Sequence, residues 1–144
     1  MLVQQILNSK PDKEVASVKP GATVRDAVAL LSARRIGAVI VSSDGKRVAG
    51  ILSERDVVRE LGRQGPGCLD QPVEQIMTST IVGCTKSDSA DQVMERMTEG
   101  RFRHMPVMEA GLMIGLISIG DVVKARLMEL GMEKDALEGM IKGF

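Results

Sequence analysis

Apolar residues along this chain follow two patterns, one typical of helices and one typical of strands. Spacings of three and four residues, which place side chains on one helical face, occur at Val24, Ala27, Val28 and Leu31 and at Ala90, Val93, Met94 and Met97. Thr23 and Ser89 precede these runs, where a hydroxyl group caps the first turn of a helix. Short apolar runs predict strands over residues 15–18, 38–41 and 48–52 and over residues 81–84, 104–108 and 113–117.

Turn residues join the second and third strands of each half into a hairpin, at residues 43–46 and 109–111. Ser53 and Ser118 then begin a second helix. The order β-α-β-β-α therefore occurs twice, which predicts an α+β fold with small mixed three-stranded sheets. Because so small a sheet is marginally stable alone, we expect the two halves to pack together as a pseudo-two-fold pair.

The two halves are also similar in sequence. The residues from Gly50 to Arg59 and those from Gly115 to Lys124 share the pattern G-h-h-S-x-x-D-V-V-[RK] at an offset of 65. Residues before them match at an offset of 66, and residues 3–7 match residues 73–77 at an offset of 70. Three matches in the same order indicate a tandem duplication.

The duplication divides the chain into a first repeat over residues 1–68 and a second over residues 69–130. A Gly-rich stretch over residues 62–67 ends the first repeat and begins the linker. Residues 131–144 follow the second repeat as a tail. Its Leu137, Met140, Ile141 and Phe144 fall on one helical face, which predicts an amphipathic helix. Such a helix covers its own core, a second subunit or a partner protein, and contact with a second subunit is favoured.

The composition restricts the partners and the chemistry. Nineteen basic and nineteen acidic residues cancel, which argues against a nucleic-acid surface and against binding to an anionic membrane. The longest apolar run, residues 36–41, is far too short to span a membrane. Two isolated cysteines and a single histidine favour a cytoplasmic protein that holds no metal.

The Ser-x-x-Asp pair of each repeat has two interpretations. In the first, Ser53 caps a helix and Asp56 completes a capping box, as do Ser118 and Asp121. In the second, the start of the helix binds a ligand, because free N–H groups attract phosphate and an aspartate can accept hydrogen bonds from a ribose diol. The two interpretations are compatible, and a cap alone does not require the glycine that precedes each pair.

These motifs resemble a tandem pair of CBS domains, the cystathionine-β-synthase-type repeat that is also called a Bateman module. The signature G-h-h-[ST]-x-x-D occurs in both halves, and Met105, Pro106 and Val107 match the family's h-P-V strand. The resemblance covers residues 2–126 and implies a regulatory binding module rather than an enzyme. It implies an adenosyl ligand in the cleft between the repeats: AMP, ADP or ATP, S-adenosylmethionine, or NAD(H).

The resemblance also implies roles for individual residues. Asp56 and Asp121 would hold the ribose diol, with Ser53 and Ser118 beside them. Arg103 and His104 would face the phosphates, next to Met105 and Pro106. The base would contact Ser17 and an apolar wall made by Ala38, Val39 and Ile40.

The same comparison predicts two unequal clefts. The counterparts of Arg103 and His104 in the first repeat are Gly37 and Ala38, which carry no charge. Because the cleft is shared, the basic pair would serve a nucleotide whose ribose is held by Asp56. The Asp56 cleft is therefore expected to bind a phosphorylated ligand more tightly. Arg34, Arg35 and Arg101 are expected at solvated helix ends, from which one of them can still reach a phosphate.

The sequence leaves three functions to compare. The favoured one is a free-standing sensor of adenine nucleotides, with AMP or ATP ahead of NAD(H), that regulates a separate protein whose identity is unknown. The second is a structural module that joins subunits and leaves its clefts empty. An enzyme is disfavoured, because no nucleophile with a base partner is apparent. In either of the first two cases we expect a two-fold homodimer.

Overall fold

The computed structural model describes residues 1–11 and 14–142 and contains the two predicted repeats. The first comprises β1 (Ser17–Val18), α2 (Val24–Arg34), β2 (Ala38–Val41), β3 (Gly50–Ser53) and α3 (Glu54–Gln64). The second comprises α4 (Ala90–Gly100), β4 (His104–Glu109), β5 (Leu112–Ser118) and α5 (Ile119–Ile141). A short helix, α1 (Val3–Ser9), precedes them, and 3-10 turns at Pro66–Asp70 and Val73–Gln75 connect them.

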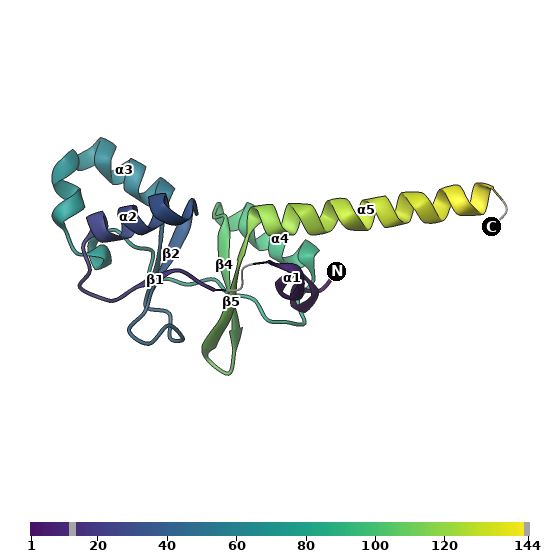
Figure 1. Cartoon of the computed structure of the whole chain (residues 1–144), viewed down its shortest axis with the longest axis horizontal. Helices are drawn as coiled ribbons and strands as arrows, with labels where there is room; N and C mark the ends of the chain where they lie inside the picture. Colours follow the sequence, from purple (N-terminus) through teal and green to yellow (C-terminus); the bar gives the residue numbers. More distant parts are fainter. Residues whose placement is uncertain (12–13, 143–144) are drawn as a thin grey trace.

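The strands of both repeats lie in the middle of the molecule, with the helices outside them (Figure 1). In the first repeat β1 pairs parallel to β2, and β2 pairs antiparallel to β3. In the second, β4 and β5 form an antiparallel pair. Their two-residue turn has Ala110 at φ 52° and Gly111 at φ 80°, the left-handed pair that a tight hairpin turn requires. The α+β prediction is confirmed.

The strand predicted over residues 81–84 is wrong. The chain makes a single parallel bridge there, between Cys84 and Val107, with the Cys84 N–H 3.0 Å from the Pro106 carbonyl oxygen. A bulge between Val107 and Met108 shifts the register of β4 at this place. The Cys84 carbonyl oxygen accepts from the Met108 N–H at 2.8 Å, so pairing is confined to the residues on either side of the bulge and does not extend into a strand.

The four predicted helix caps are confirmed. Thr23, Ser53, Ser89 and Ser118 each accept a hydrogen bond from the backbone N–H three residues later. The side chain at that third position returns a bond to the backbone N–H of the capping residue, which completes a capping box. Asp56 and Asp121 therefore both have a structural role as helix caps. Oδ2 of each carboxylate accepts a hydrogen bond at 2.9 Å from the backbone N–H of the serine three residues earlier.

The two hydrophobic cores exchange their first segments. Val3 and Ile6 of α1 are buried in the core of the second repeat, against α4, β4, β5 and α5. Val73 and Ile76, which occupy the same place at the start of the second repeat, are buried in the core of the first. The boundary in chain order at residues 68 and 69 is therefore not a boundary of packing, and each repeat depends on the other for its core.

This exchange explains the glycine that opens each signature. A Cβ atom on Gly115 would lie 2.8 Å from Cδ2 of Leu7, and one on Gly50 would lie 2.3 Å from Sδ of Met77. Leu7 and Met77 are the matching residues of the two exchanged segments. Each glycine thus makes room for the side chain that ties one repeat to the other.

We expect Gly115→Val to destabilise the protein by about 1–3 kcal/mol, because the added side chain overlaps Leu7. Chemical denaturation of the single variant and of Gly115→Val/Leu7→Ala measures the effect. Part of the loss should return in the double variant, in which the space that Leu7 fills is free. Full additivity of the two changes would contradict the contact.

The predicted tail is continuous with the second repeat. Residues 131–141 extend α5, which runs without a break from Ile119 to Ile141 and projects beyond the rest of the molecule (Figure 1). Only its first part is anchored, through the buried residues Val122 and Ala125. Phe144, which was predicted to join the apolar face of the tail, lies outside the described residues.

Candidate functional site

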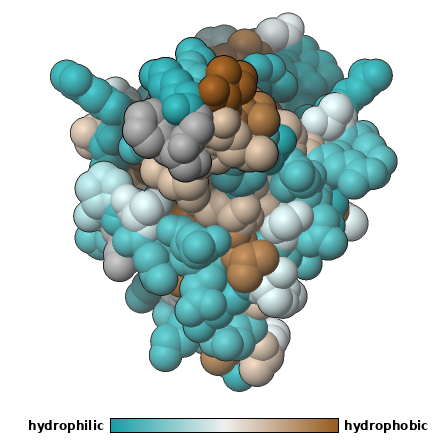
Figure 2. Space-filling model, turned by 90° about the vertical axis from the view of Figure 1, so that its right-hand side faces the viewer, coloured by the Kyte–Doolittle hydropathy of each residue, from teal (hydrophilic) through white to brown (hydrophobic). Residues whose placement is uncertain are grey.

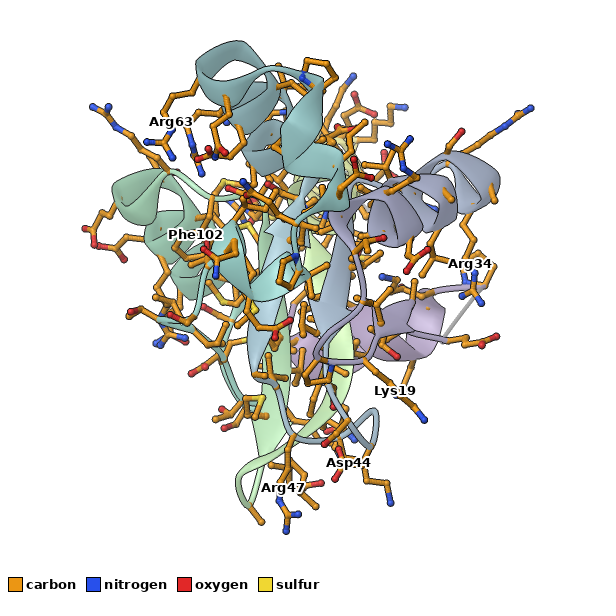
Figure 3. All side chains as sticks on the ribbon, turned by 90° about the vertical axis from the view of Figure 1, so that its left-hand side faces the viewer. Lys19, Arg34, Asp44, Arg47, Arg63 and Phe102 are labelled. Carbon is orange, nitrogen blue, oxygen red and sulfur yellow. The ribbon has the colours of Figure 1, made fainter. Side chains whose placement is uncertain are left out.

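Two cavities lie at the junction of the repeats. The larger has a volume of about 1030 Å³ and is lined by residues of α1, by the end of α2 and by β5; we call it the Lys10 cavity. The smaller has a volume of about 460 Å³ and is lined by the start of α3, by residues 78–82 and by residues 100–104; we call it the Asp56 cavity. Arg34 lines the Lys10 cavity and Phe102 lines the Asp56 cavity. The two side chains lie on opposite sides of the strands (Figure 3).

The cavities are related by the internal repeat. Residues 34–38 line the Lys10 cavity, and residues 100–104, which match them at an offset of 66, line the Asp56 cavity. Lys10 and Thr80 correspond at the offset of 70 that aligns the N-terminal segments, and they line the two cavities in the same way. The duplication has therefore produced two versions of one site, which differ in their side chains.

In the Asp56 cavity, the carboxylate is fixed by the start of α3. Its Oδ2 accepts hydrogen bonds from the Ser53 N–H at 2.9 Å and from the Ser53 hydroxyl at 3.0 Å. Its Oδ1 accepts from Arg59 at 3.0 Å, and that Arg59 side chain is 62% exposed. The carboxylate is thus rigid and mostly buried, while one of its partners can turn into solvent.

The predicted basic pair lies in the same cavity. Arg103 and His104 line it together with Ser53, Asp56, Arg101 and Phe102. The sequence prediction that these groups share a cleft with Asp56 agrees with this arrangement. Phe102, one of two phenylalanines in the chain, was not among the candidates; its position at the offset of 66 from Ile36 marks it as an apolar wall.

His104 lines both cavities and separates them. A Cβ atom on Gly37 would lie 3.1 Å from Cε1 of the imidazole, so the ring packs directly on the Gly37 backbone. Burial lowers the pKa of His104 below its ordinary value, despite the opposing charges of Glu54 and Asp121. A neutral imidazole follows at neutral pH, and its nitrogens can then donate and accept one hydrogen bond each.

In the Lys10 cavity, the predicted ribose acid already has a partner. Nζ of Lys10 lies 2.9 Å from Oδ2 of Asp121 and 2.9 Å from the Leu116 carbonyl oxygen. Burial alone would raise the pKa of Asp121, but the hydrogen bonds from the Ser118 N–H and from Lys10 hold it below its ordinary value. Ser118 and Lys10 line the cavity, whereas Asp121 lies behind Lys10.

Both cavities carry cationic side chains, which corrects the basis for expecting unequal clefts. Gly37 and Ala38 do line the Lys10 cavity, without charge, but Lys10, Arg34, Arg35 and Lys86 line it as well. Arg55, Arg59, Arg101 and Arg103 line the Asp56 cavity. Phosphate recognition is therefore available on both sides. Lys10 and Lys86 were not predicted as site residues, because they lie outside the signature strings.

The other predicted site residues lie apart from the two cavities, except Ala38. Ser17 is exposed on β1 and lines neither cavity. Val39 and Met105 are fully buried in the cores of the first and second repeats. Pro106 is also buried and lines neither cavity. The apolar wall in the structure comes from Val15, Ala16 and residues 36–38 on one side and from residues 81–82 and Phe102 on the other.

Neither cysteine forms part of this site. Cys68 and Cys84 are both buried and free. Burial raises the pKa of the Cys84 thiol to about 11, so it stays protonated and unreactive at neutral pH. Among residues 1–11 and 14–142, no three His, Cys, Asp or Glu side chains gather as metal ligands would. No helix in the same residues has the length and apolar character to cross a membrane.

Comparison with known proteins agrees with the internal repeat. The CBS domain family profile matches twice, at residues 3–63 and 73–128. The CBS-domain containing protein ATU1752 from Agrobacterium tumefaciens is 44% identical, with a TM-score of 0.83, over 88% of this chain and 99% of that one. The CBS domain-containing protein CBSX3, mitochondrial, from Arabidopsis thaliana is 37% identical over 84% of this chain, which spans 61% of that protein's length.

A third relative was solved with a ligand. The CBS domain protein PAE2072 from Pyrobaculum aerophilum, complexed with AMP, is 26% identical with a TM-score of 0.76, over 92% of this chain and 99% of that one. The fold of this chain thus agrees with both solved structures. The chain belongs to the CBS domain family and carries two copies of the domain in tandem.

Proposed function

We propose that this protein is a regulatory module that binds adenine nucleotides, AMP or ATP in preference to NAD(H), in the cavities between its repeats. The observation that carries the proposal is the Asp56 cavity, in which a fixed carboxylate and the side chains of Arg101 and Arg103 line one space. A nucleotide presents the complementary groups, a diol and an anionic phosphate, on one small molecule.

The chemistry of each lining group supports this choice. Asp56 can accept from ribose hydroxyls, because a carboxylate only accepts hydrogen bonds when ionised. Arginine binds phosphate through a planar fork of donors. Phe102, Ile81 and Val82 offer apolar surface to the base. The complex of the Pyrobaculum relative with AMP supports the same ligand class.

The excess of cationic over acidic lining residues favours phosphorylated adenosyl ligands over S-adenosylmethionine, whose sulfonium carries a positive charge. Each cavity is lined by four Arg or Lys side chains, against one acidic residue in the Lys10 cavity and two in the Asp56 cavity. Such a surface attracts anions and repels a cationic group.

The test is to identify the small molecule that co-purifies, by mass spectrometry after the protein is denatured. The chain has no Trp and no Tyr, so it hardly absorbs in the band used to measure those residues. An adenine absorption band in nucleic-acid-free protein would therefore report a bound nucleotide directly. A reduced-nicotinamide band would instead indicate NADH and overturn the preference for AMP or ATP.

The competing function, a structural module with empty clefts, predicts a different result. No nucleotide would co-purify, and calorimetric titration with AMP, ATP and S-adenosylmethionine would give no heat of binding. A sensor must also pass its signal to a separate protein, and we propose that it does so in the cytoplasm.

A further inference from the structure

The two cavities share part of one wall. Among the described residues, Gly37 and His104 alone line both of them. A Cβ atom on Gly37 would lie 3.3 Å from Nε2 of the imidazole and 3.6 Å from Oε1 of Glu54, which lines the Asp56 cavity. The ring and this carboxylate therefore flank the space that a side chain at position 37 would fill. A single imidazole thus stands between two cavities that are each lined by four cationic side chains.

The internal repeat makes this shared wall asymmetric. At the offset of 66, Gly37 and Ala38 correspond to Arg103 and His104. Ala38 lines only the Lys10 cavity, whereas His104, at the start of β4, lines both cavities. The imidazole packs over Gly37, at the position where the second repeat carries the side chain of Arg103. The two cavities therefore have one titratable group in common rather than one such group each.

Each cavity contributes one cation and one acid to the surroundings of the ring. On the side of the Lys10 cavity these are Lys10 and Asp121, which form an ion pair. On the side of the Asp56 cavity they are Arg103 and Glu54. Burial and the two cations lower the pKa of His104, and the two acids oppose that effect. The imidazole is therefore neutral in the empty protein at neutral pH, among charges that a bound anion would alter.

We propose that His104 couples the two cavities: a nucleotide bound in one of them promotes protonation of the shared imidazole and thereby strengthens the binding of a nucleotide in the other. The inference rests on the proposed function, since it needs a phosphate in each cavity. A phosphate that pairs with Lys10 or Arg103 offsets a cation that disfavours the imidazolium, and it brings negative charge close to the ring. The second nucleotide then meets a cation in the shared wall that the empty protein lacks, and the effect is reciprocal.

The coupling depends on pH in a way that identifies the imidazole as its source. Well above the imidazole pKa of the doubly occupied protein the ring stays neutral throughout, and well below that of the empty protein it stays charged throughout. In neither range does the first nucleotide change the charge that the second one meets. Between these two pKa values the second AMP should gain about 5-fold in affinity relative to the first. This is the lower end of the usual range for coupled sites, because the two phosphates also repel each other.

The first test is calorimetric titration with AMP over a range of pH, in wild type and in His104→Gln. Glutamine keeps a neutral donor and acceptor but cannot gain a proton. Wild type should bind AMP cooperatively in an intermediate pH range only and should take up protons, which are counted from the heats in buffers of different ionisation enthalpy. The phosphate of AMP also titrates, at about pH 6, but it does so with both proteins. His104→Gln should therefore show no cooperativity, and its proton uptake should be that of the phosphate alone.

The second test reads the imidazole directly by nuclear magnetic resonance, because His104 is the only histidine of the chain. In untagged protein its single ring signal gives the imidazole pKa, which AMP should raise. Glu54→Gln should lower this pKa in the empty protein, because the carboxylate opposes the effect of burial. Glu138→Gln is the matched control and should leave it unchanged. Glu138 is likewise an exposed helical glutamate, but it belongs to the projecting end of α5, which Figure 2 shows end-on within a mostly hydrophilic surface.

The outcomes separate this inference from the proposed function. If wild type binds no AMP in either cavity, both are overturned. The inference alone is overturned if a single AMP binds, if two AMP molecules bind without moving the imidazole pKa, or if wild type and His104→Gln are equally cooperative. Circular dichroism checks that each variant is folded. The ring signal of wild type, with and without AMP, tests the inference even if His104→Gln does not fold.

Discussion

Asp56→Ala should weaken AMP binding at the tighter of the two sites by about 10- to 150-fold, equivalent to ~1.5–3 kcal/mol, the scale of a lost hydrogen bond to a charged group. Asp56 is the better placed of the two ribose acids. Its ion-pair partner Arg59 is 62% exposed and can turn away, whereas Lys10, the partner of Asp121, is held by a second bond to the Leu116 carbonyl. A ribose diol therefore displaces a more weakly held partner at Asp56 than at Asp121.

The difficulty with this variant is that Asp56 also caps α3, so its removal affects the fold. Asp26→Ala is the matched control, because Asp26 completes an equivalent capping box at the start of α2 and lines neither cavity. Both variants should lose about 1 kcal/mol of stability. Calorimetric titration should show weakened AMP binding for Asp56→Ala alone. Equal losses of affinity would mean that Asp56 acts only as a cap.

Local patterns in the sequence predicted the parts of the fold that depend on neighbouring residues. The caps at Thr23, Ser53, Ser89 and Ser118 need only a hydroxyl and a partner three residues later, and all four are present. The hairpin at Ala110 and Gly111 depends on backbone conformations that the turn residues favour. The duplication gave the order of elements in both repeats.

Features that depend on distant residues could not be predicted in this way. Val3 and Ile6 match Val73 and Ile76 in sequence, but nothing in that match says that each pair packs in the other repeat. Val39 and Met105 were assigned to the site by family position, although both point into a core. The strand expected at residues 81–84 is reduced to one bridge beside the bulge of β4 at Val107 and Met108, and the apolar character of the segment does not reveal such a shift in its partner.

Lys10 is the clearest example of a site residue that the sequence motifs did not predict. It lies 111 residues from Asp121, at the end of a helix that belongs to the first repeat in chain order and to the second in packing. No motif joins the two residues, and the prediction that the Asp56 cleft binds a phosphorylated ligand more tightly followed from comparing the signature strings alone. In the structure Lys10 neutralises the acid that a ribose would need, and it stands where a phosphate could replace that acid as its partner.

Removal of Lys10 should therefore change the selectivity of the Lys10 cavity. Adenosine must separate Lys10 from Asp121 and offers no anion in return, whereas AMP replaces the carboxylate with a phosphate. In Lys10→Ala the ratio of AMP affinity to adenosine affinity should fall by about 10-fold or more, because a charge-assisted bond to phosphate is lost and the penalty on adenosine disappears. In the Asp56 cavity, Arg103→Ala should likewise weaken AMP more than adenosine.

The two cavities can be measured separately by disabling one at a time. Titrations of Lys10→Ala are made in Asp56→Ala protein, in which the Lys10 cavity is the stronger site, and those of Arg103→Ala in Lys10→Ala protein, in which the Lys10 cavity has lost its phosphate partner. Because His104 lines both cavities, each background is first titrated without the second change, so that an effect carried across the shared wall is subtracted. An unchanged ratio of AMP affinity to adenosine affinity in Lys10→Ala would mean that Lys10 only holds α1 against the second repeat and does not contact the ligand. A fall in adenosine affinity equal to that of AMP would point to the same structural role, because a residue that contacts phosphate must distinguish the two ligands.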